Sequence, residues 1–240
     1  MSATHGHALS AVVALFLAIH APLILAGDPP DLASNPVTGW VESVDIATDS
    51  GDRVRHAEDG PTALGGSDQL ISTDAGISPR IACRADGQTW IVWWRDADPD
   101  QVHFRYRDAS TSAWSDEGLV SESNEPGRHP ELVIDGTTTW VAFETDDGLD
   151  TGVSVRAVTD SPEPFDTQVT IATTDFDGDV AVMIHAELGH LWVTWVDSPD
   201  DVGWSEYDHT GDIWALPQYE PYEGHFKVAL EAIQAIVHGN

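Results

Sequence analysis

Four short stretches of the sequence decide the fold: Trp40-Val-Glu-Ser-Val44, Trp90-Ile-Val-Trp-Trp94, Trp140-Val-Ala-Phe-Glu144 and Trp192-Val-Thr-Trp-Val196. Each begins with Trp and continues with branched or aromatic residues in partial alternation, which is the pattern of a β-strand. The leading tryptophans follow one another at intervals of 50, 50 and 52 residues. A fixed interval of this length is typical of a repeat architecture in which every repeat is one small sheet.

The flanks of these stretches repeat as well. Shorter apolar runs precede three of them, at 79–83, 130–134 and 181–185, and Asp-Gly pairs that favour hairpin turns follow the first two runs. A third run lies downstream in each unit, at 102–107, 153–158 and 202–207, and an aromatic residue opens a fourth. Each unit of about 50 residues is therefore predicted to be a four-stranded antiparallel meander, as in a propeller blade.

The fold class predicted from these repeats is an all-β propeller of four-stranded antiparallel blades, with about four blades visible. A β-sandwich of unequal strands is the alternative. The first unit lacks a clear innermost strand before Trp40, so closure of the ring stays open. The C-terminal stretch 228–240 can supply that strand or form a short helix. We favour a closed ring over an open arc or an assembly in which two chains complete one another.

The chain divides into four predicted segments. Residues 8–26 are almost wholly apolar and end at Leu25-Ala26-Gly27, so residues 1–26 are predicted to be a signal peptide and the protein to be secreted or extracytoplasmic. An uncleaved anchor is the alternative, because the run is near the length of a membrane span. A linker is expected at 27–36, the propeller repeats at 37–225, and the closing strand or helix at 226–240.

The charge of the chain excludes several partners. It carries 41 acidic and 10 basic residues, a formal net charge of −31 at pH 7. No basic surface is available to neutralise phosphates, which argues against nucleic acid and against an anionic membrane surface. Cys83 is the one cysteine, so no disulfide can form within the chain. We interpret Cys83 as a small buried apolar residue rather than a reactive thiol.

The hairpins between the third and fourth strands carry a family resemblance. They read Ala57-Glu-Asp-Gly-Pro-Thr-Ala-Leu64, Arg107-Asp-Ala-Ser-Thr-Ser-Ala-Trp114, Thr159-Asp-Ser-Pro-Glu-Pro-Phe165 and Ser205-Glu-Tyr-Asp-His-Thr-Gly-Asp-Ile-Trp214. This pattern resembles the Asp-box of sialidase-like (BNR-type) propellers, although none of the four copies is complete. The matching aspartates are Asp59, Asp108, Asp160 and Asp208, and the closing residues are Leu64, Trp114, Phe165 and Trp214.

The resemblance implies structural roles for these residues. A turn aspartate accepts backbone N–H bonds, and the aromatic residue holds the hairpin onto the blade. Trp40, Trp90, Trp140 and Trp192 are likewise expected to be structural. A sialidase would also need an arginine triad, a Tyr–Glu nucleophile pair and an acid Asp, and none of these can be carried over residue by residue. The predicted inner strands offer Arg80, Arg84, Glu131 and His185.

Clustered acids mark one face of the predicted propeller. Asp96, Asp98 and Asp100 share one loop, and Asp175, Asp177 and Asp179 share another. An i, i+2, i+4 spacing can direct several carboxylates at one hard cation, so calcium is a possible cofactor, with solvated turn acids as the alternative. No other cofactor is predicted.

The function predicted from the sequence is that of an exported acidic binding or interaction module, with a glycan or a protein as ligand. A glycan hydrolase of sialidase type is the first alternative, since paired carboxylates can serve glycoside hydrolysis. A half-propeller that works only as an oligomer is the second. We predict no catalytic residue.

Overall fold

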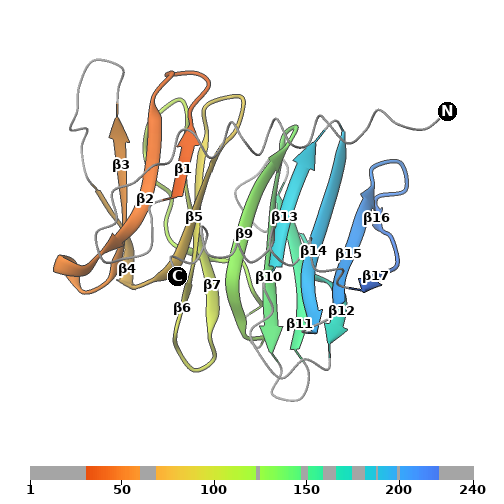
Figure 1. The fold of residues 1–240 in the computed structure, drawn as a ribbon. Coiled ribbons are helices and arrows are strands. Elements are labelled where there is room, and N and C mark those ends of the chain that lie inside the picture. Colours follow the sequence, from red (N-terminus) through yellow and green to blue (C-terminus); the bar gives the residue numbers. More distant parts are fainter. Residues whose placement is uncertain are drawn as a thin grey trace.

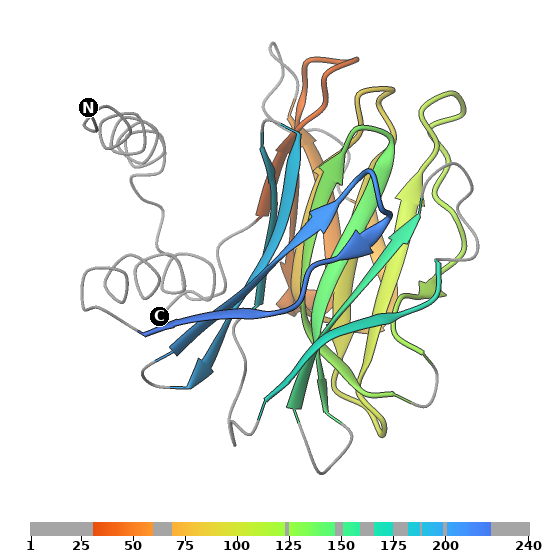
Figure 2. The ribbon, with the colours of Figure 1, turned by 90° about the vertical axis from the view of Figure 1, so that its right-hand side faces the viewer.

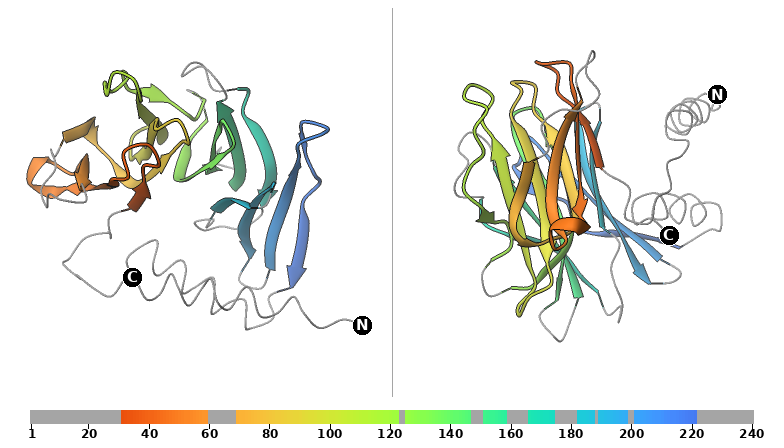
Figure 3. Two further views of the ribbon diagram at one scale, coloured as in Figure 1. Left: turned by 90° about the horizontal axis from the view of Figure 1, so that it is seen from above. Right: turned by 90° about the vertical axis from the view of Figure 1, so that its left-hand side faces the viewer.

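The structure is a computed structural model of the 240-residue chain, and it describes residues 31–59, 69–122, 125–146, 151–158, 166–174, 182–187, 189–198 and 201–221. These residues form four antiparallel sheets that follow one another along an arc (Figures 1 and 3). The predicted all-β propeller of four-stranded blades is confirmed. Within the described residues, no hydrogen-bonded ladder joins the first sheet to the fourth.

The first two sheets are simple meanders in chain order. The first contains β1 (Asp31–Ser34), β2 (Val41–Ala47), β3 (Arg53–Asp59) and β4 (Gln69–Ala75), with the 3-10 helix η1 (Thr48–Ser50) between β2 and β3. The second contains β5 (Ile77–Cys83), β6 (Thr89–Arg95), β7 (Gln101–Arg107) and β8 (Gly118–Leu119). The Asp-Gly turn between β5 and β6 has Gly87 at φ 89°, the left-handed conformation that favours glycine.

The third and fourth sheets repeat this plan and pack beside each other (Figure 2). The third contains β9 (Gly127–Asp135), β10 (Thr138–Asp146), β11 (Thr151–Val158) and β12 (Val169–Thr174). The fourth contains β13 (Val182–Glu187), β14 (His190–Ser198), β15 (Asp201–Asp208) and β16 (Ile213–Trp214), and β17 (Gln218–Pro221) also pairs with β15.

Strand β1 lies inside the segment that the sequence assigns to a linker, and it supplies the inner strand that the first repeat lacks. The stretch Asp31-Leu-Ala-Ser34 contains no β-branched or aromatic residue, so it gives little strand signal. Tertiary pairing holds it instead, because β1 pairs with β2 and the Asp31 carboxylate accepts the backbone N–H of Ile81 at 2.8 Å.

Strict alternation of side chains fills the spaces between neighbouring sheets. In β10, Val141 and Phe143 face the second sheet, whereas Trp140 and Ala142 face the fourth. Trp192 occupies the position in β14 that corresponds to Trp140, on the face where no further described sheet packs. It is therefore only half-buried.

The other repeat tryptophans differ in burial. Trp90 is buried between the second and third sheets, but Trp40 directly precedes β2 and is 38% exposed. Of the four repeat tryptophans, Trp90 and Trp140 are thus the most deeply buried.

Two predicted segments, the signal peptide at 1–26 and the closing element at 226–240, lie outside the described residues. Among the residues that are described, no helix is both long and apolar enough to cross a membrane. The assembly of two chains into one ring stays a prediction.

Candidate functional site

The inner strands of the first three sheets bring one charged residue each to the axis of the arc. Arg80 on β5 donates to the Glu131 carboxylate on β9, with Nε 2.9 Å from Oε1, and Asp31 on β1 lies in the field of the same guanidinium. Burial raises the pKa of both carboxyl groups, and Arg80 offsets only part of that rise. One guanidinium thus serves two carboxyl groups whose pKa values burial has raised.

The three arginines on or beside the inner strands do not converge. Arg80 pairs with Glu131, Arg84 reaches Gln88 in its own hairpin, and Arg128 pairs with the carboxylates of Asp100 and Asp146. No tyrosine lies on the described inner strands β1, β5, β9 and β13. The described part of the axis therefore lacks the constellation that a sialidase needs. For His185, only the backbone position in β13 is described.

In the acid-rich loop for which calcium is a predicted ligand, one of the three carboxylates is already bonded to other groups of the protein. Asp100 is buried, and its carboxylate bonds the Arg128 guanidinium and accepts the N–H of Ala97 at 3.1 Å. Asp96 and Asp98 are exposed in the same loop. The second predicted trio, Asp175, Asp177 and Asp179, lies outside the described residues.

Two hairpin aspartates act as turn acceptors. The Oδ1 atom of Asp108 accepts the backbone N–H groups of Ser110 and Thr111 at 3.0 and 2.8 Å, and Asp208 accepts that of Thr210 at 2.8 Å. Hydrogen bonds from Ser110 and Thr111 lower the pKa of Asp108 to about 2. For the equivalent Asp59, only the end of β3 is described, and Asp160, Phe165 and Leu64 lie outside the described residues.

The space beneath the second sheet's hairpin is filled by a buried polar network. Arg107, at the end of β7, reaches the carboxylates of Glu42 and Glu58 from the first sheet. Glu42 is fully buried and lies 3.1 Å from His56 Nε2. Trp114 covers the network, with its ring centroid 5.1 Å from that of His56.

This network contains the one group of described residues with metal-ligand spacing. The ligand atoms of Glu42, His56 and Glu58 lie within 4.8 Å of one another. However, the Arg107 guanidinium already contacts both carboxylates and supplies the positive charge that a cation would bring. We interpret the group as a structural ion-pair network that joins the first two sheets.

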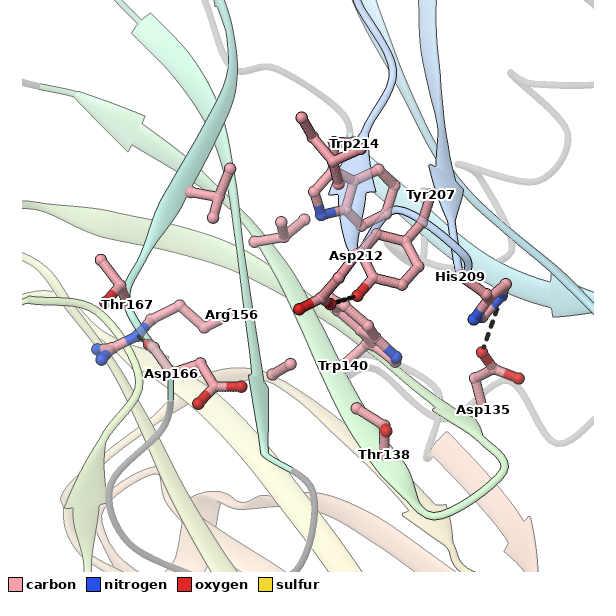
Figure 4. Close-up of a pocket in the computed structure, with 14 residues that line it drawn as sticks. Asp135, Thr138, Trp140, Arg156, Asp166, Thr167, Tyr207, His209, Asp212 and Trp214 are labelled. Atoms are coloured by element: carbon pink, nitrogen blue, oxygen red, sulfur yellow. Dashed lines mark hydrogen bonds and ion pairs between the residues drawn. The ribbon is translucent and has the colours of Figure 1, made fainter.

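The corresponding space beneath the fourth sheet's hairpin is an open pocket of about 610 Å³ (Figure 4). Tyr207 takes the position of Arg107 directly before the hairpin aspartate, and Trp214 takes that of Trp114. The pocket lies between the third and fourth sheets and is lined by Asp135, Thr138, Trp140, Val155, Arg156, Ala157, Asp166, Thr167, Val169, Tyr207, His209, Asp212, Ile213 and Trp214. A cavity of this size accommodates a small organic ligand.

Three aromatic rings form one wall of this pocket. The Tyr207 ring centroid lies 4.7 Å from that of Trp140 and 5.3 Å from that of Trp214, and the two indoles are 5.7 Å apart and nearly perpendicular. Trp140 is 7% exposed, whereas Tyr207 and Trp214 are half-buried and keep part of their surface free. The Trp140 indole N–H has no hydrogen-bond acceptor among the described residues.

The polar wall of the pocket is acidic. Tyr207 donates its hydroxyl to Asp212, and Asp135 pairs with His209 at 3.4 Å, while Asp166 lies on the opposite side of the opening (Figure 4). Arg156 donates from Nε to the backbone carbonyl of Asp166 at 2.8 Å. Three carboxylates and one guanidinium thus line the pocket.

The titration of Tyr207 reflects this charge. Burial, the hydrogen bond to Asp212 and the nearby carboxylates raise the pKa of Tyr207 to about 12. The phenol is therefore protonated at neutral pH, so it serves as a hydrogen-bond donor and not as an activated nucleophile.

The repeats predict that Trp140 and Trp214 lie on neighbouring blades and have structural roles, and the spacing of acids predicts ligand groups on the loops of the other face. The missed residues are Asp135, Arg156, Asp166, Tyr207, His209 and Asp212. One signal was available. Tyr207 is the one aromatic residue among the four that directly precede the hairpin aspartates, whereas the second repeat has Arg107 there.

Comparisons with known proteins give the fold a context. No protein-family model matches the chain, and no curated protein sequence matches it. Among solved structures, the chain is similar to an endo-arabinase from Bacteroides thetaiotaomicron, with a TM-score of 0.54 and 12% identity over 83% of this chain and 82% of the other. A protein of unknown function from Dyadobacter fermentans has a TM-score of 0.55 and 9% identity over 79% and 67% of the two chains.

A Hadza microbial sialidase is also similar in fold, with a TM-score of 0.56 and 10% identity over 79% of this chain. The chain spans 46% of that sialidase. At these identities the likeness concerns the fold alone, and it agrees with the resemblance to sialidase-like propellers seen in the repeats.

Proposed function

We propose that this chain is an exported β-propeller that binds glycans, and that the pocket between the third and fourth sheets is its binding site. The observation that carries the proposal is the combination of the half-buried Tyr207 and Trp214 rings with carboxylates around one opening. A pyranose ring presents apolar C–H faces that pack on aromatic rings and hydroxyl groups that donate to carboxylates. The pocket offers both kinds of surface.

The comparison between repeats supports the same proposal. Beneath the second sheet's hairpin, Arg107 closes the space with ion pairs, whereas the equivalent space beneath the fourth sheet's hairpin stays open around Tyr207. The open space is therefore not a requirement of the blade architecture. Similar folds include a sialidase and an endo-arabinase, which makes a carbohydrate a reasonable ligand class to test.

The test is a titration of the full chain with a panel of soluble oligosaccharides, followed by the same titration of two variants. We expect Trp214→Ala to weaken binding of the best ligand by tenfold or more, on the order of 1.4 kcal/mol. Trp192→Ala is the matched control, because Trp192 is a half-buried tryptophan of the same sheet that does not line the pocket.

A second pocket variant distinguishes loss of the binding site from a folding defect caused by Trp214→Ala. Val169 lines the pocket and is 43% exposed, so Val169→Arg places a long side chain at the opening without emptying the core. Equal binding by wild type, Trp214→Ala and Val169→Arg contradicts the proposed site, and no binding of any glycan contradicts the proposed function.

A second candidate function, glycan hydrolysis at the axis, is favoured by one observation. Asp31 and Glu131 both have raised pKa values beside Arg80, and a carboxyl group that holds its proton can act as a general acid. Release of reducing sugar by the wild type that is lost in Glu131→Gln, with glycan binding in the pocket retained, supports this alternative. Equal release by both proteins contradicts it.

A further inference from the structure

The charge distribution of the aromatic pocket identifies a class of sugar, and this inference rests on the proposed function. Asp135, Asp166 and Asp212 line the pocket against the single guanidinium of Arg156. That guanidinium donates to the backbone carbonyls of Asp166 and Val120, and the charges of Glu122 and Asp166 also act on it, so it is already engaged by groups of the protein. An acidic sugar would bring another carboxylate beside these three, and like charges repel at this distance.

We propose that the pocket selects amine-bearing sugars, such as glucosamine units, over their neutral and acidic counterparts. A protonated amine carries three N–H donors on a compact cation, which the pocket carboxylates can accept. The sugar ring itself retains the apolar face that packs on Tyr207 and Trp214.

The three carboxylates are not equivalent in this role. Asp212 already accepts the Tyr207 hydroxyl, and Asp135 pairs with His209. The side chain of Asp166 is exposed, and its charge acts on the neighbouring Arg156 guanidinium and on Tyr207 without a hydrogen bond to either side chain. Figure 4 places Asp166 across the opening from the ring of Tyr207. Asp166 is therefore the carboxylate most available to a ligand amine.

The Trp140 indole N–H is an independent feature of the same wall. Its nitrogen is buried and has no acceptor among the described residues, although the side chain lines the pocket. A buried donor without an acceptor is unfavourable, and a hydroxyl oxygen of a bound sugar can supply the missing acceptor once the adjacent rings adjust. An ammonium group cannot accept this bond, so the ligand must present hydroxyl oxygens as well as an amine.

The experiment measures the binding of two disaccharides with the same backbone, at a pH below the pKa of the amine. One is the glucosamine disaccharide, and the other is its N-acetylated form, which lacks the positive charge. We expect the full chain to bind the amine form about two- to fivefold more tightly, the range of a partly exposed ion pair. The preference should shrink as salt is added.

Two single-charge variants separate the pocket from the general attraction of a chain with net charge −31 for cations. Asp166→Asn should abolish the preference for the amine form. Asp96→Asn removes the same charge from an exposed loop residue that does not line the pocket, and it should leave the preference unchanged.

The outcomes distinguish the two levels of the proposal. Equal or tighter binding of the N-acetylated form, or of an acidic disaccharide, overturns the amine selectivity while glycan binding stands. If the preference for the amine form survives both Asp166→Asn and Asp96→Asn, it arises from the overall charge of the chain, and the assignment to the pocket is overturned. The absence of binding by every disaccharide overturns both.

Discussion

Glu117 is predicted to make the stability of this protein depend on pH in a way that can be calculated. Its carboxylate accepts the backbone N–H and hydroxyl of Thr73 on β4, both at 3.0 Å, and the Arg95 guanidinium at 2.6 Å, and it lies 3.0 Å from His103 Nδ1. Burial raises the pKa of Glu117, but the hydrogen bonds from His103 and Thr73 outweigh it and lower the pKa from 4.5 to about 2. The group joins the outer strand of the first sheet to the second sheet.

A pKa that is lower in the folded state stabilises the protein at high pH. The stabilisation is complete above the unfolded pKa and is lost as the pH falls through the folded pKa. A shift from 4.5 to about 2 corresponds to about 3 kcal/mol, of which roughly 1.4 kcal/mol is lost by pH 3.5. The side chain is 12% exposed, so solvent screening removes little of this energy.

Urea unfolding of wild type and Glu117→Gln between pH 6 and pH 3.5 measures this contribution. High, constant salt should be present to screen the repulsion among excess acids. We expect Glu117→Gln to be less stable by up to about 3 kcal/mol at pH 6 and the difference to narrow by about half at pH 3.5. The matched control is Asp116→Asn, an exposed neighbour whose difference from wild type should stay small. A Glu117→Gln difference that is constant across this range refutes the reasoning.

Four further predictions follow from individual contacts. Arg107→Met leaves the buried Glu42 carboxylate without its guanidinium and should lower the free energy of unfolding in urea by about 3–5 kcal/mol. Arg55→Met breaks a half-exposed pair with Asp45 and should lower it by about 1 kcal/mol or less. A Cβ at Gly203 would lie 2.2 Å from the Trp195 ring, so Gly203→Ala should lower the free energy of unfolding by about 1–3 kcal/mol; an unchanged value would show that the ring moves freely. Cys83 is only partly buried, not fully buried as predicted, and desolvation followed by Glu42 raises the pKa of its thiol to about 12. Alkylation at pH 8 should therefore be slow until urea unfolds the chain, and equally fast labelling of native protein would contradict the raised pKa. Ultraviolet titration of the tyrosines should contain a component near pH 12 that is missing from the curve of Tyr207→Phe. Identical curves for wild type and variant above about pH 11 would contradict the acidic environment of Tyr207.

The repeats were readable from sequence because each blade must alternate its side chains between two neighbours. Val141 and Trp140 point to opposite sheets, and that alternation at a spacing of about 50 residues predicts stacked four-stranded sheets. Strand β1 was missed because Asp31-Leu-Ala-Ser34 relies on pairing with β2 and on contact with Ile81, which no local pattern records.

The candidate site was harder to predict because its residues come from different blades. Asp135 and His209 are far apart in sequence, and only the packing of the third sheet on the fourth brings them together. Acids that are adjacent in sequence predict a site on the opposite face instead, where Asp100 is paired with Arg128. Proximity along the chain was thus a poor guide to proximity in the folded repeats.

Arg80 and Glu131 also differ in how far local sequence predicts their positions and their contact. Each follows a proline in equivalent inner strands, and the residues before those prolines, Ser78 and His129, have φ values of 47° and 46°. The repeat alignment predicts this equivalence, but the ion pair between them depends on the side-by-side packing of β5 and β9.

A crystal structure of the full chain soaked with the glucosamine disaccharide is the most direct measurement of glycan recognition by this propeller. We predict a sugar ring packed on Tyr207 and Trp214, with its amine beside Asp166. A sugar bound at Asp31, Arg80 and Glu131 instead, or an aromatic pocket that stays free of sugar at saturating concentration, would contradict the proposed site.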